Sequence, residues 1–100
     1  MTKREYLYVV AMEECAELTK ALSKCCRFGG NLCGVDGYCN EDNTIYEYCD
    51  LMATIEMLYA AGGLPHYDKE EIEQLKADKK EKVEKYWNER NERNDLPRQG

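Results

Sequence analysis

Two pairs of acidic residues have the spacing expected of a metal site. Glu14 and Glu17 form the first pair, and Glu47 and Asp50 form the second. Residues three positions apart lie on the same side of an α-helix, so each pair would direct two carboxylates the same way. Carboxylates without histidine or cysteine at a matching spacing suit a hard cation better than zinc. The pairs therefore predict a Mg²⁺ site, with Mn²⁺ as an alternative.

Both pairs interrupt helical faces that are otherwise largely apolar. The face around the first pair follows alternating steps of three and four, through Leu7, Val10, Glu14, Glu17, Ala21 and Lys24. The face around the second pair continues in the same way, through Glu47, Asp50, Thr54, Met57 and Ala61. Crowded carboxylates on a packing surface are costly, so we expect a cation between two antiparallel helices. The competing interpretation is that these acids are solvated or form weak ion pairs with nearby lysines.

The four acids are expected to lie on two helices. Thr2 and Glu5 have the spacing of a capping box, which predicts a first helix that continues to about Arg27. Residues 28–42 hold four of the seven glycines and no helical repeat, so they predict a loop of about fifteen residues. A loop of that length is often functional, and substrate contacts are one role for it.

Two further helices follow this loop. Asp42 or Asn43 is expected to cap a second helix, which runs to about Ala61 before a Gly-Gly segment ends it. Asp68 with Glu71 forms another capping box, which predicts a third helix to about residue 94. The second helix is apolar on most of its circumference after Leu51, so it needs cover on more than one side.

Length and pattern together predict one all-α domain over residues 1–94, with a flexible tail at 95–100. The expected architecture is a helical hairpin plus a C-terminal helix, which completes a four-helix-type bundle by oligomerisation. A chain of 100 residues buries a limited share of its surface, so a homodimer or homotetramer is expected.

Charge and hydropathy indicate which binding partners and which cellular compartment to expect. Twenty acidic residues against fourteen basic ones give a net charge of −6, which disfavours binding to a nucleic-acid polymer. Glutamates interrupt the N-terminal segment before a secretory or membrane-spanning stretch accumulates, so we expect no membrane association. These features predict a cytoplasmic protein.

The six cysteines are compatible with a disulfide framework, because the number is even and the chain is short. Without an export signal, reduced thiols are the favoured interpretation, with Cys15 and Cys49 packing near the acidic pairs. A structural zinc site is disfavoured because no CxxC pair occurs among its candidate ligands, Cys25, Cys26, Cys33 and Cys39.

The segment EECAEL at residues 13–18, followed by Ala21, Lys24 and Arg27, resembles a motif of the all-α nucleoside triphosphate pyrophosphohydrolase superfamily. That motif is written EExxEL with a following K and R, and the segment EYCD at residues 47–50 resembles the second motif, ExxD. The superfamily includes MazG-like proteins, dimeric dUTPases and phosphoribosyl-ATP pyrophosphatases. The resemblance covers roughly residues 4 to 60, and the stretch 82–85 more loosely.

The resemblance implies a Mg²⁺-dependent hydrolase that converts a nucleoside or deoxynucleoside triphosphate to the monophosphate and pyrophosphate. Its implied metal ligands are Glu14, Glu17, Glu47 and Asp50. Glu13 is a candidate to orient or deprotonate the attacking water.

Basic and aromatic residues are the candidates for substrate binding. The basic residues that would contact phosphate are Lys24, Arg27, Lys82 and Lys85. The alternative interpretation is that they are ordinary solvated surface residues. The residues that would stack on a base are Tyr38, Tyr46 and Tyr48. The alternative interpretation is that these side chains only pack against the protein. Two alternatives stay open: a phosphoribosyl-ATP pyrophosphohydrolase and a non-catalytic helical interaction module of the same fold.

Overall fold

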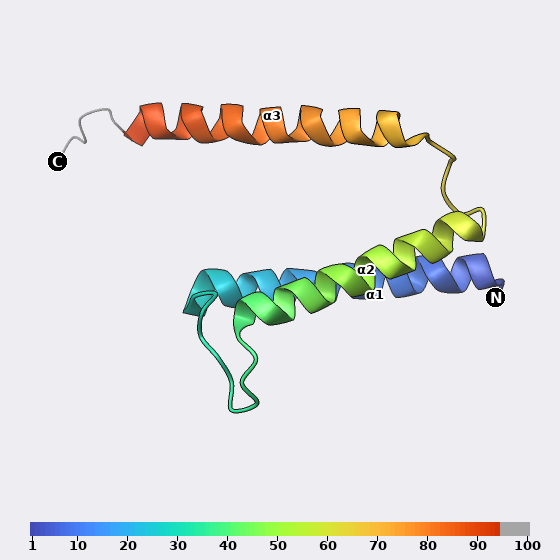
Figure 1. Cartoon of the computed structure of the whole chain (residues 1–100), viewed down its shortest axis with the longest axis horizontal. Helices are drawn as coiled ribbons and strands as arrows, with labels where there is room; N and C mark the ends of the chain where they lie inside the picture. The colour runs from blue at the N-terminus through green and yellow to red at the C-terminus, as the bar shows by residue number, and fades with distance from the viewer. Residues whose placement is uncertain (95–100) are drawn as a thin grey trace. The chain divides into compact units, whose positions relative to one another are not determined.

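The computed structural model describes residues 1–94, and three helices make up most of them (Figure 1). In chain order these are α1 (Lys3–Phe28), α2 (Asn40–Ala60) and α3 (Lys69–Asn94). Within residues 1–94 no strand is present, and an isolated bridge links Cys33 and Cys39. The prediction of an all-α fold with three helices is therefore confirmed.

The expected caps form at two of the three helix starts. Thr2 Oγ1 accepts the backbone N–H of Glu5 at 3.1 Å, and Asp68 Oδ1 accepts that of Glu71 at 2.8 Å. These bonds satisfy N–H groups that have no partner within the helix.

The predicted cap of the second helix is wrong. Helix α2 starts at Asn40, with Cys39 at the N-cap position, so neither Asp42 nor Asn43 caps it. Asp42 lies inside the first turn, where its carboxylate accepts the N–H of Cys39 at 3.0 Å. An aspartate can accept a free N–H both as the N-cap residue and from the third position of the helix. The residue type of Asp42 therefore did not determine where α2 begins.

Helix α2 ends in a glycine motif that turns the chain sharply. Gly62 has a φ of 76°, and its N–H bonds to the carbonyl of Tyr59 at 3.0 Å. The N–H of Gly63 bonds to the carbonyl of Leu58 at 2.9 Å, which completes a Schellman motif. A Cβ on Gly63 would clash with Leu58 Cδ1, so a side chain at this position would force the buried Leu58 side chain to move.

Helices α1 and α2 pack side by side as an antiparallel hairpin (Figure 1). At one end Arg4 Nη1 donates to the carbonyl of Gly62 at 3.3 Å, and the Tyr8 hydroxyl donates to the carbonyl of Gly63. At the other end Cys25 Sγ and Thr44 Oγ1 are 3.3 Å apart. These contacts fix which turns of the two helices face each other.

The core between α1 and α2 is thin. Its buried residues are Leu7, Ala11, Ala21, Thr54 and Leu58. Three of the five are small, which lets the two backbones approach closely. The hydroxyl of Thr54 donates to the carbonyl of Asp50 at 2.9 Å, so the one polar side chain among these five residues has a partner.

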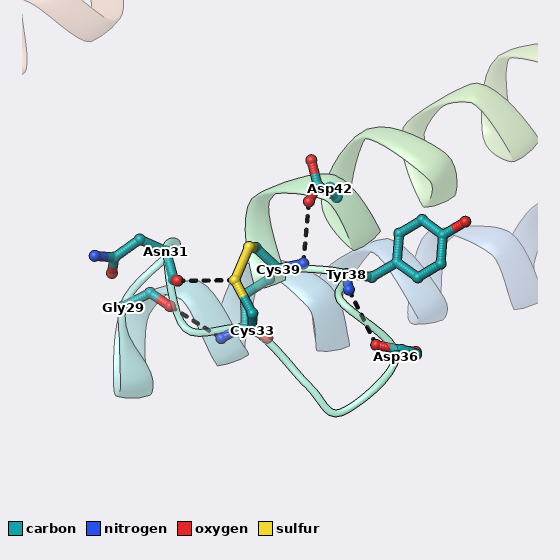
Figure 2. The surroundings of a disulfide bond; sticks show 8 residues. Gly29, Asn31, Cys33, Asp36, Tyr38, Cys39 and Asp42 are labelled. Carbon is teal, nitrogen blue, oxygen red and sulfur yellow. Dashed lines mark hydrogen bonds between the residues drawn. A yellow bond between two sulfur atoms is a disulfide. The ribbon is translucent and has the colours of Figure 1, made fainter.

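The loop between α1 and α2 covers residues 29–39 and is an ordered hairpin, shorter than the predicted 28–42. The N–H of Gly34 bonds to the carbonyl of Tyr38 at 3.0 Å, and the N–H of Asn40 bonds to that of Leu32 at 3.0 Å. This pairing places Cys33 and Cys39 directly opposite each other, and they form a disulfide (Figure 2). The prediction of mostly reduced thiols agrees with the other four cysteines, which are free, and is wrong for this pair, because the turn brings together two cysteines that lie six residues apart.

The chain divides into two compact units, Met1–Pro65 and His66–Gly100. Helix α3 dominates the described part of the second unit, and polar contacts within the helix include Gln74 Nε2 to Asp78 Oδ1 at 2.9 Å. The expectation of one domain over residues 1–94 stays a prediction, and the expected flexible tail at 95–100 lies outside the described residues. None of the helices within residues 1–94 has the length and apolar character required to cross a bilayer.

Candidate metal-binding site

The buried stripes of α1 and α2 determine which acids face the opposite helix. On α1, the buried and half-buried positions include the series 7, 11, 14, 18, 21 and 25, and Val10 and Ser23 are half-buried beside it. On α2, they include the series 44, 47, 51, 54 and 58, which Ala61 at the C-cap continues, and Asn40, Ile55 and Tyr59 are half-buried as well. Glu14 and Glu47 are therefore half-buried members of these stripes, whereas Glu17 and Asp50 are exposed and lie at their edges.

Three carboxylates meet where these stripes cross. Glu14, Glu47 and Asp50 each offer one oxygen, and these oxygens lie within 4.8 Å of one another. Oxygens that share one Mg²⁺ ion lie about 3.0 Å apart when adjacent and about 4.2 Å apart when opposite, because each Mg–O distance is about 2.1 Å. The three side chains would therefore have to bring their oxygens closer together to share one small cation.

The three carboxylates repel one another, and the effect is clearest at Glu14. The pKa of Glu14 is raised above its ordinary value of 4.5, first because packing withdraws water from the carboxylate. The charges of Asp50 and Glu47 raise it further, followed by those of Glu17 and Glu13. Neither ion pair found in the described part of the chain involves Glu14, Glu47 or Asp50. A bound cation would supply the missing positive charge.

The other two predicted acids lie beside this group. Glu17 Oε2 is 3.8 Å from Lys20 Nζ, one turn along the helix, so Glu17 faces a lysine and is not in the three-carboxylate group. Glu13 is exposed, and its charge makes the smallest contribution to the raised pKa of Glu14.

A cavity of about 130 Å³ adjoins the carboxylate group between α1 and α2. Its lining residues are Glu17, Lys20, Ala21, Lys24, Asn40, Asn43 and Glu47. Lys24 is the predicted substrate-binding residue that lies here. Sequence reasoning did not assign Lys20, Asn40 or Asn43 to this site, although Lys20 and Lys24 have the spacing that places both on one side of a helix.

Three predicted phosphate contacts do not line this cavity. Arg27 Nε donates to the carbonyl of Ser23 at 3.4 Å, and its guanidinium carbon lies 5.0 Å from the centre of the Phe28 ring. Lys82 and Lys85 belong to α3 in the second unit, where they line a surface depression with two acidic residues. The assignment of these two lysines to the substrate stays a prediction.

The candidate stacking residues include one aromatic pair. Tyr38 and Tyr46 contact edge to face, with ring centres 5.6 Å apart and planes at 73°. The pKa of Tyr46 is raised above 10.0, mainly by its interaction with Tyr38. Tyr48 is exposed on α2.

Four cysteines carry free thiols in this structure, and two of them flank the acids in sequence. Cys15 follows Glu14, and Cys49 precedes Asp50. Both cysteine side chains are exposed, so the prediction that they pack near the metal-bearing turns is wrong for the hairpin described here. Cys15 and Cys49 are sequence neighbours of Glu14 and Asp50, and adjacent residues on a helix point in different directions. Their side chains therefore project away from the three-carboxylate group.

The chain was compared with protein-family models, curated proteins and solved structures. No protein-family model matches the chain, and no match is found among curated proteins or solved structures.

We predict that Glu14 makes the metal-free protein less stable as the pH rises. Its folded pKa lies above the ordinary value of 4.5, so the folded state holds this proton more tightly than the unfolded state. The resulting stabilisation is full below about pH 4.5 and is lost as the pH rises through the folded pKa. Urea unfolding in EDTA across this range should show Glu14→Gln gaining stability over wild type as the pH increases.

Glu56→Gln provides the control for this comparison, because Glu56 is an exposed carboxylate on α2 outside the three-carboxylate group. Its pH profile is the reference for removing a carboxylate from the same helix. Parallel pH profiles for wild type and Glu14→Gln would contradict the account of the Glu14 environment.

Proposed function

We propose that this chain is a MazG-like nucleoside triphosphate pyrophosphohydrolase that requires Mg²⁺, with Mn²⁺ as a substitute. The observation that carries the proposal is the meeting of Glu14, Glu47 and Asp50, whose oxygens lie within 4.8 Å of one another. These residues come from two motifs that are 33 positions apart in sequence, counted from Glu14 to Glu47, and they meet because the helices are antiparallel.

The donor set fits a hard divalent cation. All three groups are carboxylates, which Mg²⁺ and Mn²⁺ prefer, and Glu14 is half-buried with a raised pKa. When bound, the cation would neutralise phosphate oxygens and lower the pKa of an attacking water. Glu17, at the edge of the same face, is proposed as a fourth ligand, which requires it to turn away from Lys20.

The adjoining cavity supplies the groups that a triphosphate needs. Lys20 and Lys24 can offset phosphate charge, and the amides of Asn40 and Asn43 can donate to phosphate oxygens. Glu47 belongs to both the carboxylate group and the cavity wall, so substrate and cation would lie next to each other.

Other residues have supporting roles in this proposal. Glu13 is assigned to orient or deprotonate the attacking water, because it neighbours the carboxylate group and is accessible. Arg27 is assigned to an additional phosphate contact. The products are a nucleoside monophosphate and pyrophosphate.

We predict that Glu47→Gln abolishes most of the activity and leaves the fold intact. The amide has almost the same shape as the carboxylate, but it removes a negative charge at the proposed cation. Pyrophosphate release should fall on the order of a hundredfold or more. The measurement is pyrophosphate release from a panel of nucleoside and deoxynucleoside triphosphates with Mg²⁺, and the panel includes phosphoribosyl-ATP.

Circular dichroism checks the fold of the variant, and Glu56→Gln serves as the matched charge control on the same helix. A folded Glu47→Gln protein with near-wild-type activity would refute the assignment of Glu47. Preference for phosphoribosyl-ATP would redirect the proposal to that substrate. A wild-type protein inactive on the whole panel would favour the non-catalytic interaction module.

We further propose that the active form is a homodimer or homotetramer, which completes a four-helix-type bundle. A two-helix hairpin has no second layer, and its large exposed apolar side chains include Tyr6, Val9, Met12, Leu22, Ile45, Met52 and Met57. A second copy of the hairpin would cover such a surface. Light scattering at micromolar concentration should give a mass of two or four chains, and a stable folded monomer would contradict this part of the proposal.

A further inference from the structure

The disulfide Cys33–Cys39 closes the hairpin that joins α1 to α2 (Figure 2). The N–H of Gly37 bonds to the carbonyl of Gly34 at 3.1 Å, which forms the turn between the two cysteines. Gly37 has a φ of 85°, a conformation that glycine adopts without strain. Cys33 is exposed and Cys39 is half-buried, so a small thiol can reach the bond from the Cys33 side.

The base of this hairpin holds the first turn of α2 against the end of α1. Asn40 Nδ2 donates to the carbonyl of Gly29 at 2.9 Å, and the N–H of Glu41 bonds to the carbonyl of Gly30 at 2.9 Å. The bond from the N–H of Cys39 to Asp42 adds a contact within the turn (Figure 2). Cys39 is therefore both a disulfide partner and the N-cap residue of α2.

This first turn also forms one wall of the cavity beside the carboxylate group. Asn40 and Asn43 line the cavity from α2, and Lys20 and Lys24 line it from α1. Asn40 directly follows the disulfide-bonded Cys39 in sequence. Glu47 lies about two turns further along the helix, so loosening at Cys39 reaches the asparagines before it reaches the carboxylates.

We propose that Cys33 and Cys39 form a redox switch that controls phosphate binding in this cavity. In the oxidised state the short covalent loop restricts the first turn of α2 and keeps both asparagines in the cavity wall. In the reduced state this turn opens more often, and the cavity binds phosphate groups more weakly. This inference rests on the proposed function, because it assigns the cavity to the phosphates of the substrate.

The switch operates by ordinary thiol–disulfide exchange. A thiolate of a dithiol reductant attacks one of the two sulfurs, which breaks the Cys33–Cys39 bond and forms a mixed disulfide. The second thiol of the reductant then releases that sulfur. Both cysteines end as thiols, having gained two electrons and two protons, and the reductant leaves as its disulfide. A small-molecule disulfide reverses the process with the same balance.

Two measurements on the full chain test the switch without using catalysis. Hydrogen exchange is followed at the backbone amides of residues 40–43 after treatment with glutathione disulfide or dithiothreitol. Inorganic pyrophosphate binding with Mg²⁺ is measured by calorimetry on the same samples. Reduction should speed the exchange on the order of tenfold, because a link that closes a short loop is lost. It should weaken pyrophosphate binding several-fold.

Two variants serve as matched controls. Cys33→Ser with Cys39→Ser should show the reduced behaviour under both treatments, and Cys26→Ser, which removes an exposed free thiol, should respond as wild type does. Alkylation and peptide mapping after oxidation should find Cys33 and Cys39 blocked by their mutual bond.

The switch would be overturned by equal exchange in the two redox states, by a double variant that still responds, or by free thiols at both positions after oxidation. Failure of pyrophosphate to bind in either state would also overturn it, because the cavity would not be a phosphate site. If pyrophosphate binds with the expected redox dependence but no triphosphate is hydrolysed, the switch stands and the proposed function fails.

Discussion

The carboxylates of Glu14, Glu47 and Asp50 crowd together between α1 and α2, and their repulsion underlies the chemistry proposed for this hairpin. Small buried residues, Ala11 and Ala21 among them, let the two helices pack closely. That packing brings Glu14 within reach of Glu47 and Asp50 and raises the pKa of Glu14. Carboxylates in such a group destabilise the fold unless positive charge joins them. A divalent cation would turn this unfavourable arrangement into a stabilising one, which is the physical basis of the proposed enzyme.

The sequence was sufficient to predict the three helices and the approach of Glu14 to Glu47 and Asp50, but it also placed Glu17 in that group. Capping residues such as Thr2 and Asp68 marked helix starts correctly, because a side-chain oxygen three residues before a free N–H has few alternative partners. The register of the buried stripe was harder to predict. Stepping by threes and fours admits two neighbouring series on one helix, and only packing against α2 selects the series that contains Ala11 and excludes Glu17. Glu14, Glu47 and Asp50 therefore form one group and Glu17 lies beside it, although the residue spacing predicted the same role for all four acids.

The loop between the helices shows a second limit of sequence reasoning. Its glycines and cysteines indicated a long irregular connection with mostly free thiols. The pairing of Cys33 with Cys39 follows from a turn at Gly34 to Gly37, whose hydrogen bonds are visible only in three dimensions. The same turn sets the start of α2, which explains why the cap was misplaced. Cys39 thus closes the disulfide loop and caps α2, and its neighbour Asn40 lines the cavity. These three features depend on one another through the two residues.

We propose that Glu14, Glu47 and Asp50 hold a divalent cation, and Mn²⁺ binding followed by electron paramagnetic resonance tests this claim. The wild-type protein should reduce the free Mn²⁺ signal saturably. Glu14→Gln and Asp50→Asn should each weaken the affinity on the order of tenfold or more, because a charged ligand is lost. Glu56→Gln should bind as wild type does. A wild-type protein that leaves the Mn²⁺ signal unchanged, or site variants that bind as tightly as wild type, would contradict the claim.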